Sequence, residues 1–479
     1  MTDKQSNLSR RKFIITSATG LAGATLLSSL DQDTLKKSIT QDVRKGEEWR
    51  VSGSFAGDEL KNLRTREEVL AEATEGIEKY RKGKAELTFV DPEGKIKQGL
   101  AVDIIQKEHA FDWGCSSAGT LKEDAESEEK RERTKNFVAL FNCTTAKCYW
   151  TERWHQPIEK EEGNRITKTF TDEVQWGLSN GLRVKGHPLV WTVRKAIPEW
   201  MDKYSYPEQL KHLENHVRSM IRTGGKSVNR WDLCNEMLWE PSLRNLAKRD
   251  WPHIENVNEI LSYLEPAVHW AKEENPDAIY SLNDYGLEVT YTTRVTAREQ
   301  RKRYVDLVNE MKKRGCAPDA VGTQCHVAGW YAPDVFKRSL NDLSQAGLPV
   351  QITEFWANIK DCPDKSLAPD VIKSKLLEYV SDCYTIAFGH KEVNHFTFWG
   401  GAGIDRAGKK TEVYDIIYKL VKEKWQTNLS LSTNKAGIVS FRAFYGDYSI
   451  RYKDKNGNIR SVDYAVSPHR DNKVIINLL

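Results

Sequence analysis

Apolar residues in this chain gather in short runs that are separated by longer amphipathic segments. Between residues 107 and 426 eight such runs have the length of strands, and the segments between them can each hold a helix. The runs cover residues 111–115, 143–147, 183–191, 230–236, 278–285, 320–326, 350–355 and 394–400. Strands that alternate with helices pair in parallel, and eight of them close into a barrel. The pattern therefore predicts the α/β class, with a (β/α)8 TIM barrel over residues 107–426.

The chain changes character on both sides of the predicted barrel. Residues 31–84 are polar and charge-rich, and they predict a linker followed by a short helix. Residues 85–106 alternate around a turn and predict a small N-terminal β unit. Residues 427–479 contain further strand-like runs with an Asn456-Gly457 turn signal. We expect this last segment to be a small antiparallel β appendage that either packs on the barrel or binds sugar.

The first thirty residues have the pattern of a bacterial export signal. Arg10 and Arg11 precede an uncharged apolar run over residues 15–30, which is typical of a twin-arginine signal. The alternative, a membrane anchor, needs ~20 apolar residues, and this run is shorter. We therefore expect residues 1–30 to be a twin-arginine signal, the protein to be periplasmic or extracellular, and no membrane span to remain after the signal is removed.

Composition narrows the class of protein. Of the 479 residues, 39% are hydrophobic, which is enough for a large core and too many for a disordered chain. The 72 basic and 68 acidic residues nearly balance, so we expect no nucleic-acid partner. The 15 tryptophans suit the apolar faces of sugar rings as well as an ordinary core. The eight cysteines lack zinc-ligand spacing, and we expect most of them to be buried free thiols.

Polar and aromatic residues stand where the predicted strands end. They are His187, Asn235, Glu236, Asn283, Asp284, Gln324, His326, Glu354 and Trp399. The carboxyl ends of barrel strands form the mouth at which such proteins carry out chemistry, so six strands direct these groups to one place. A metal site built from the two histidines and Asp284 is an alternative, but the first strand offers no paired histidines. We expect no metal and no cofactor.

Two of these residues, Glu236 and Glu354, are carboxylates on the fourth and seventh strands, which face each other across the mouth. Hydrolysis of a glycosidic bond needs an acid that protonates the leaving oxygen and a second carboxylate that attacks or activates water. The pair therefore predicts a glycoside hydrolase with a polysaccharide substrate. The alternative reading is that both are solvated acids at strand ends.

Six ordered motifs resemble glycoside hydrolase family ten, the retaining endo-β-1,4-xylanase family. They read GHPLVW (186–191), WDLCNE (231–236), NDY (283–285), QCH (324–326), ITE (352–354) and TFWG (397–400). The resemblance implies that Glu236 is the acid/base and Glu354 the nucleophile of a double displacement. It also implies a set of substrate-binding residues within the motifs: His187, Trp191, Asn235, Asn283, Tyr285, Gln324, His326 and Trp399.

The loop after the second strand departs from the family. Xylanases usually carry Glu-Asn-Glu-x-Lys at the positions that here read Lys147, Cys148, Tyr149, Trp150 and Thr151. The hydrogen-bonding groups of that subsite are therefore not the usual ones. In addition, Trp356 replaces the family's aspartate that partners the histidine, and residues 401–406 lack the expected second tryptophan. We count Lys147 among the substrate-binding residues and expect Lys147 or Arg406 to meet a uronate or sulfate.

Three hypotheses follow from the sequence. The first is an endo-β-1,4-xylanase or a close relative of one. The second is a barrel that binds glycans without cleaving them, which the two glutamates argue against. The third is a retaining hydrolase of another β-linked sugar, such as a decorated or acidic glycan. The sequence indicates no particular oligomeric state.

Overall fold

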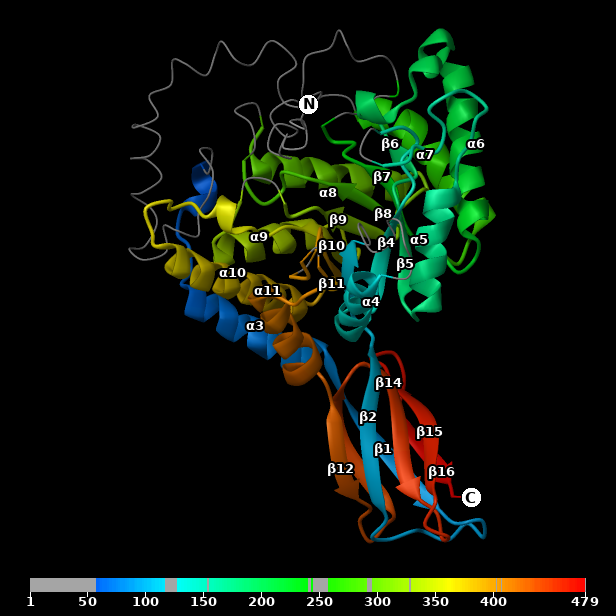
Figure 1. Ribbon diagram of the computed structural model, residues 1–479, viewed down its shortest axis with the longest axis vertical. Helices are drawn as coiled ribbons and strands as arrows, with labels where there is room; N and C mark the ends of the chain where they lie inside the picture. The colour runs from blue at the N-terminus through cyan, green and yellow to red at the C-terminus, as the bar shows by residue number, and fades with distance from the viewer. Residues whose placement is uncertain are drawn as a thin grey trace.

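The computed structural model describes residues 57–116, 127–152, 155–239, 243, 257–290, 295–326, 329–401, 403–405 and 407–478. The predicted export signal (1–30) and Arg406 lie outside the described residues. Figure 1 shows a barrel ringed by helices, with a β unit that projects from one end of it.

The barrel is a closed parallel sheet with the strand order β5-β4-β3-β11-β10-β9-β8-β7-β6, and an additional pairing of β5 with β7 completes the ring. Its strands are β3 (Asp112–Ser116), β4 (Cys143–Lys147), β5 (Arg183–His187), β6 (Val190–Trp191), β7 (Arg230–Asn235), β8 (Ile279–Asp284), β9 (Ala320–Thr323), β10 (Val350–Phe355) and β11 (Val393–Phe398). The eight predicted runs all hold strands, and the third run is divided into β5 and β6. The prediction of a (β/α)8 barrel is confirmed.

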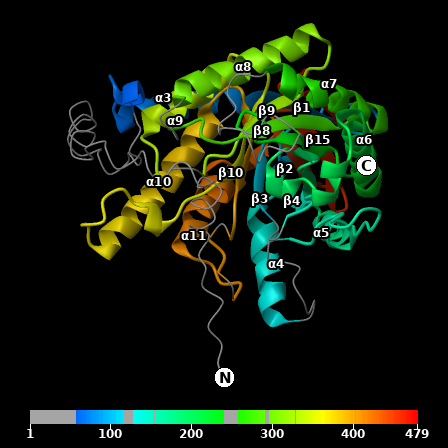
Figure 2. The same ribbon diagram turned by 90° about the horizontal axis from the view of Figure 1, so that it is seen from above.

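Helices follow the strands and surround the sheet, as the view from above shows (Figure 2). They are α4 (Glu128–Leu140), α5 (Lys168–Ser179), α6 (Tyr206–Gly224), α7 (Val257–Glu274), α8 (Ala297–Lys313), α9 (Pro333–Ser344), α10 (Pro369–Gly389) and α11 (Glu412–Tyr418). Shorter helical turns are η2 (Gly57–Leu60), η3 (Arg194–Ala196), η4 (Glu199–Lys203), η5 (Ile359–Asp361) and the π-helical η6 (Lys419–Lys424). Local sequence sets where these helices begin: Thr296 and Glu299 form a capping box at the start of α8.

A helix ahead of the barrel, α3 (Arg66–Tyr80), packs on the outside of this ring against α10. The two helices touch at glycines, because a Cβ atom on Gly76 would lie 2.1 Å from the carbonyl oxygen of Gly389. Arg66 adds a bidentate pair with the buried Asp382, at 2.8 Å for both bonds. The short helix predicted within residues 31–84 is therefore part of the barrel's outer layer.

The β unit consists of two sheets built from both ends of the described chain. One sheet has the order β13-β1-β16 and the other the order β12-β2-β14-β15. The strands are β1 (Lys82–Val90), β2 (Ala101–His109), β12 (Asn428–Ser432), β13 (Ile438–Phe444), β14 (Gly446–Lys453), β15 (Ile459–Val466) and β16 (Lys473–Asn477). The two β segments predicted from the sequence are thus both present and join into one unit. Most pairs are antiparallel as predicted, whereas β16 runs parallel to β1.

The β unit has a hydrophobic core of its own, which includes Leu87, Ile104, Tyr448 and Ile450. It meets the barrel through Phe444, whose ring lies 5.9 Å from that of Phe388 in α10. Since β2 leads directly into β3, the unit sits at the amino ends of the barrel strands, opposite the mouth (Figure 1).

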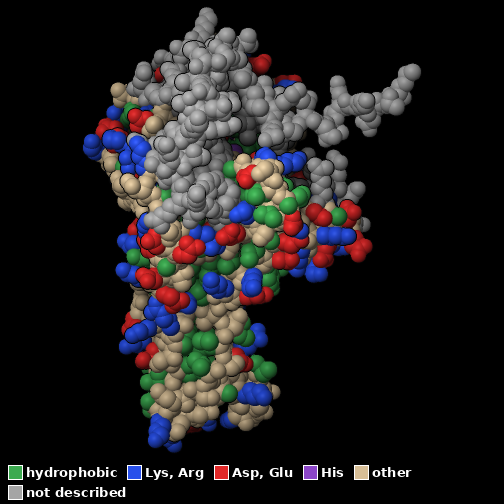
Figure 3. All heavy atoms as spheres, turned by 90° about the vertical axis from the view of Figure 1, so that its left-hand side faces the viewer, with side chains coloured by type: hydrophobic (Ala, Val, Ile, Leu, Met, Phe, Trp, Pro, Cys, Tyr) green, Lys and Arg blue, Asp and Glu red, His purple; other side chains and the backbone are tan. Residues whose placement is uncertain are grey.

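The surface of the described part mixes charges of both signs. On the face seen in Figure 3, acidic and basic side chains alternate over the barrel and do not gather in one patch. None of the described helices is both long and apolar enough to cross a membrane. All eight cysteines are free and buried, which confirms the prediction of buried thiols.

Candidate active site

The two glutamates singled out by the sequence lie at the same end of the barrel. Glu236 directly follows β7, and Glu354 is the penultimate residue of β10, close to its carboxyl end. Glu236 adopts a left-handed backbone conformation with φ of 61°, which side chains other than glycine rarely take. Its backbone N–H donates to the carbonyl of Asn283 at 2.8 Å, which holds this turn against β8.

The Glu236 carboxylate is fixed by two donors. The indole N–H of Trp191 donates to Oε2 at 2.8 Å, and the amide of Gln324 donates to Oε1 at 3.1 Å. The side chain remains half-buried. Both oxygens are therefore oriented from β6 and from the end of β9 while the group keeps contact with the mouth.

Glu354 is buried and surrounded by polar side chains. Its Oε1 accepts from the amide of Asn283 at 2.9 Å and lies 3.9 Å from Nε2 of His187, and its Oε2 lies 3.5 Å from Nε2 of His326. Burial, reinforced by the negative charge of Glu236, raises the pKa of Glu354 to about 7, although His187 opposes the shift. The charge of Glu236 is thus close enough to affect the titration of Glu354.

The side-chain amide of Asn235 links the residues that contact the two carboxylates. Oδ1 of Asn235 accepts from Asn283 at 2.8 Å and from Gln324 at 3.2 Å. Asn283 also contacts Glu354, and Gln324 also contacts Glu236. The hydroxyl of Thr353 donates to Asn283 at 2.5 Å and fixes the orientation of that amide. Four strand ends therefore hold the pair in a single hydrogen-bonded network.

His187 is oriented by a carboxylate that the sequence analysis did not select. Its Nδ1 is 2.8 Å from Oδ2 of Asp232, whose other oxygen lies 2.6 Å from the ammonium of Lys185. Although burial opposes it, the Lys185 charge holds the pKa of Asp232 well below its usual range. A charged residue in the middle of the apolar run 230–236 was the available signal for this role, because such a residue is buried only when it is paired.

His326 lacks the family's aspartate and is oriented differently. Its Nε2 lies 2.6 Å from the amide oxygen of Gln324. Trp356, which replaces the aspartate, turns its indole N–H to Asp361 at 3.1 Å, and its ring covers Gly400. Burial lowers the pKa of His326 to about 4, so the imidazole is neutral at neutral pH.

Aromatic rings line the mouth around the glutamates. The ring of Trp399 lies 5.4 Å from that of His187, and the Lys147 ammonium lies 5.2 Å from the centre of the Trp399 ring. Tyr285 stacks on Trp239 at 5.3 Å, farther along the wall. The structure thus brings Lys147 and Trp399 together beside His187.

The altered loop after β4 packs into the barrel wall. The Cys148 thiol donates to the carbonyl of Pro188 at 3.3 Å, and Trp150 stacks on the buried His216 at 4.4 Å. Tyr149 lies against His187 and Trp191, with ring centres 5.7 Å and 5.4 Å apart. Burial raises the pKa of Tyr149, and the charges of Glu354 and Glu236 reinforce the shift. Tyr149 therefore lies at the site, although from the sequence it was noted only as part of the loop that differs from the family pattern.

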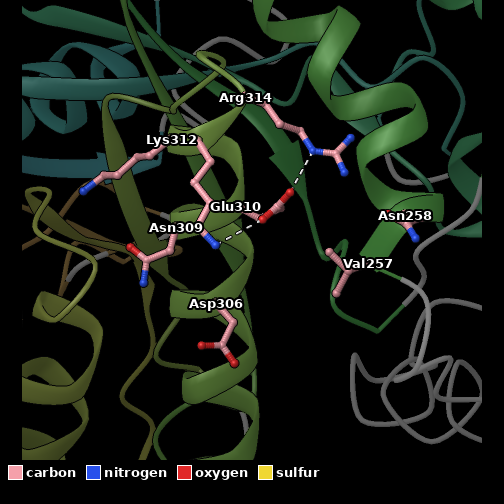
Figure 4. Close-up of a pocket in the computed structure, with 8 residues that line it drawn as sticks. Val257, Asn258, Asp306, Asn309, Glu310, Lys312 and Arg314 are labelled. Carbon is pink, nitrogen blue, oxygen red and sulfur yellow. Dashed lines mark hydrogen bonds and ion pairs between the residues drawn. The ribbon is translucent and has the colours of Figure 1, made fainter.

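Two other features lie away from the mouth. Among the described residues, Asp112, Cys143 and His395 come close enough to share a metal ion, but the Asp112 carboxylate already pairs with Arg183 at 3.0 Å and Arg230 at 2.9 Å. These two cations disfavour a metal there. A surface hollow of about 710 Å³ lies between the start of α7 and the end of α8, where Glu310 pairs with Arg314 (Figure 4). It contains none of the strand-end residues.

A closed (β/α)8 barrel with two hydrogen-bonded carboxylates at its mouth has the features of the barrel glycoside hydrolases as a class. The chain belongs to Glycosyl hydrolase family 10, whose family model matches residues 107–406. The resemblance stated from the six motifs is confirmed.

Individual relatives are distant. Anti-sigma-I factor RsgI6 of Acetivibrio thermocellus is 23% identical over 391 residues, which cover 79% of this chain and 46% of that protein. Beta-1,4-xylanase of Dictyoglomus thermophilum is 28% identical over 237 residues, which cover 48% of this chain and 63% of that protein. The chain thus spans less than two thirds of the length of either relative.

Solved structures support the fold. The structure of a family 10 protein from Paenibacillus barcinonensis is 20% identical, with a TM-score of 0.52, and the match covers 66% of this chain and 95% of that one. Native xylanase 10B from Thermotoga maritima is also 20% identical, with a TM-score of 0.51, covering 74% of this chain and 98% of that one. At this identity the likeness concerns the fold alone.

Proposed function

We propose that the protein is a retaining glycoside hydrolase that cleaves β-1,4-xylan or a related β-linked polysaccharide by double displacement. The observation that carries the proposal is the shared network in which Asn235 links the surroundings of Glu236 and Glu354. Membership of family 10 supports the reaction class.

In the proposed mechanism Glu236 is the acid/base and Glu354 the nucleophile. The Glu354 carboxylate attacks the anomeric carbon while the Glu236 carboxylic acid gives its proton to the leaving oxygen. Water then attacks the glycosyl ester and transfers a proton to Glu236, which restores both groups. Glu236 suits the acid role because it is half-buried at the mouth, where a leaving sugar has room.

The neighbours of Glu354 support its role as the nucleophile. Asn283 donates a hydrogen bond to Oε1, which favours the carboxylate form that must attack. His187 faces the same oxygen with its Nε2, and Asp232 fixes the orientation of its ring. These groups counter the burial that raises the pKa of Glu354.

We propose further that the substrate carries an acidic group. Lys147 is only 6% exposed and stands at the mouth beside Trp399, at a position where the family has a carboxylate. An ammonium in such a site is suited to a uronate or a sulfate. The neighbouring Cys148 uses its thiol on Pro188 and supplies no amide to a sugar hydroxyl.

The experiment that tests the reaction is reducing-sugar release from plain β-1,4-xylan, glucuronoxylan and a panel of sulfated or mixed-linkage algal glycans, with Glu354→Ala as the control. We expect release from at least one glycan that is lost in the variant. If no glycan is cleaved while one of them is bound, the protein is a binding barrel and the proposal fails.

Replacing Lys147 tests the acidic substrate. Lys147→Met keeps the length of the side chain and removes the charge, so we expect it to weaken cleavage of the acidic glycan by about tenfold and to spare plain xylan. A Lys147→Glu variant that gains xylan activity and keeps full activity on the acidic glycan contradicts this part of the proposal.

We propose that the protein is exported by the twin-arginine route. The twin arginines and the short apolar run in residues 1–30 support this. Replacing Arg10 and Arg11 together by lysine should leave the protein in the cytoplasm of its bacterial host, as measured by cell fractionation. Unchanged export of that variant contradicts the route.

A further inference from the structure

A strained turn lies directly behind both glutamates. It is formed by Gln324, Cys325 and His326 at the end of β9, and Cys325 has a φ of 54°, in the left-handed region that favours glycine. The residues on either side of Cys325 point to different carboxylates. Gln324 donates to Glu236 at 3.1 Å, and His326 lies 3.5 Å from Glu354. The shape of this one turn therefore sets contacts to both members of the pair.

The turn is held by a buried acid from the neighbouring loop. Glu288 is 1% exposed, and its Oε1 accepts from the thiol of Cys325 at 3.1 Å. The hydroxyl of Thr323, the last residue of β9, donates to the same oxygen. Thr323, just before the turn, and Cys325, within it, are thus both hydrogen-bonded to Glu288.

Backbone hydrogen bonds attach the turn to the neighbouring strands. The N–H of Gln324 donates to the carbonyl of Asp284 at 2.9 Å, and the carbonyl of Cys325 accepts from the N–H of Trp356 at 3.3 Å. These bonds fix the ends of the turn to β8 and β10. They leave the Cys325 side chain to be fixed by Glu288.

Glu288 is itself kept in place. Arg301 in α8 donates to the carbonyl of the preceding residue, Leu287, at 2.7 Å, and it also pairs with Glu59 at 2.9 Å. Burial raises the pKa of Glu288, which favours its neutral form. A neutral carboxyl group with a carbonyl oxygen as acceptor suits the thiol and hydroxyl donors that face it.

We propose that Glu288 is a positioning residue that holds the left-handed turn at Cys325 and thereby places Gln324 and His326 against the two carboxylates. The inference rests on the proposed function for its kinetic consequences. Glu288 itself is not proposed to touch the substrate, because it acts through the turn.

Two variants of Glu288 separate the hydrogen bond from the volume of the side chain. Glu288→Gln keeps an acceptor oxygen of the same reach, and we expect it to retain kcat within about threefold. Glu288→Leu fills similar space without an acceptor, and we expect kcat to fall by at least about tenfold with little change in KM, because small misplacements of catalytic groups are costly. Should Glu288→Leu not fold, Glu288→Ala replaces it.

Relief of the strain provides the rescue test. Cys325→Gly removes the need for an anchor, because glycine adopts positive φ without steric cost. We expect the Glu288→Leu/Cys325→Gly double variant to recover most of the lost kcat. A merely structural role predicts no recovery, since the double variant lacks still more packing. Wild-type kcat in folded Glu288→Leu, or failure of the double variant to recover, overturns the proposal.

The titration of His326 gives a readout that needs no enzymatic activity. In the wild type we expect its imidazole to titrate at a pKa of about 4, and in Glu288→Leu nearer the ordinary 6.5, as the turn opens to water. NMR titration follows this, with a His326→Asn variant identifying the signal among the 11 histidines. An unchanged pKa in folded Glu288→Leu contradicts the proposal even if no glycan is hydrolysed, whereas an inactive wild type contradicts only the proposed function.

Discussion

At the scale of single residues, the site combines a buried carboxylate, that of Glu354, with neighbours that oppose the effect of burial on its pKa. Glu354 is 6% exposed, and its ionised form is disfavoured by burial and by the charge of Glu236. Asn283 and His187 act in the opposite direction. The protein therefore holds a carboxylate where the folded state would be more stable with a neutral group, which is common at catalytic sites.

This cost predicts a pH-dependent stability change in Glu354→Gln. The pKa of Glu354 is raised from 4.5 to about 7, so the folded state binds more protons than the unfolded state between these pH values. Wild-type stability accordingly falls as the pH rises through this range. We expect Glu354→Gln to be more stable than the wild type by up to about 3 kcal/mol at pH 8, with no gain at pH 4.

Urea unfolding of wild type and variant at both pH values measures the difference. Glu93→Gln, a change at an exposed glutamate, serves as the control and should show no such dependence. If the two proteins differ in stability by the same amount at pH 4 and pH 8, the stability cost does not come from the charge on Glu354.

The coupling of the two glutamates predicts a shift in the pH profile of Glu236→Gln. The neutral amide no longer raises the pKa of Glu354, so the acid limb of kcat/KM should move to lower pH. An aryl glycoside with a good leaving group is the substrate, because it needs no proton from residue 236. Trp191→Phe, which keeps the Glu236 charge, is the matched control. An acid limb at the same pH in Glu236→Gln would mean that the two carboxylates do not interact.

At the scale of elements, the strand ends decide which residues meet. The apolar runs alone locate the eight strands, because each buried strand must be apolar and its polar end marks the mouth. Glu236, Glu354, Asn235, Asn283, Gln324 and both histidines are therefore found from the sequence. Asp232 and Glu288 are harder to identify, since their roles depend on Lys185 in β5 and on Cys325 in the turn after β9.

The same reasoning explains what the sequence could not predict about the outer elements. Residues 66–80 show helical spacing, but only the structure shows that this helix packs on α10, more than 280 residues later in the chain. Likewise, β1 has a turn signal after it, yet its partners are β13 and β16 near the other end. Pairings over such separations leave no periodic signal along the chain.

The glycine contact between α3 and α10 predicts a stability effect. A methyl group on Gly76 would meet the backbone of Gly389, which cannot move aside as a flexible side chain could. We expect Gly76→Ala to lower the free energy of unfolding by about 1–3 kcal/mol and to leave kcat of the folded protein unchanged. Glu75→Ala on the exposed face is the control. Equal thermal stability of Gly76→Ala and the wild type contradicts close packing of the two helices.

At the scale of the whole molecule, the β unit joins the two ends of the described chain on the side opposite the mouth (Figure 1). Its exposed large apolar side chains among the described residues are Ile96, Ile459, Val474 and Ile475, which are all aliphatic. Sugar-binding surfaces use flat aromatic rings. In this unit the rings of Phe89 and Tyr448 are buried, whereas Tyr445 and Tyr464 are only partly buried. The two roles left open by the sequence, packing on the barrel and sugar binding, therefore both stay predictions.

Because strands from both ends form the unit, neither end should be removable alone. Truncation after residue 426 would expose Leu87 and Ile104, which are fully buried in the complete chain. We expect the truncated protein to be insoluble or much less stable. As a milder test, Ile450→Ala should cost about 2–4 kcal/mol, whereas the exposed Ile475→Ala should cost little. A truncated protein with the thermal stability of the full chain contradicts this account.

The central claim is that Glu354 attacks the anomeric carbon and Glu236 completes the reaction with retention. The most direct test is to follow the first product by proton NMR, using the glycan of the panel that the wild type cleaves best. Double displacement predicts that the new reducing end appears first as the β-anomer and that Glu354→Ala forms no product. Initial formation of the α-anomer, or equal cleavage by Glu354→Ala, would contradict the account.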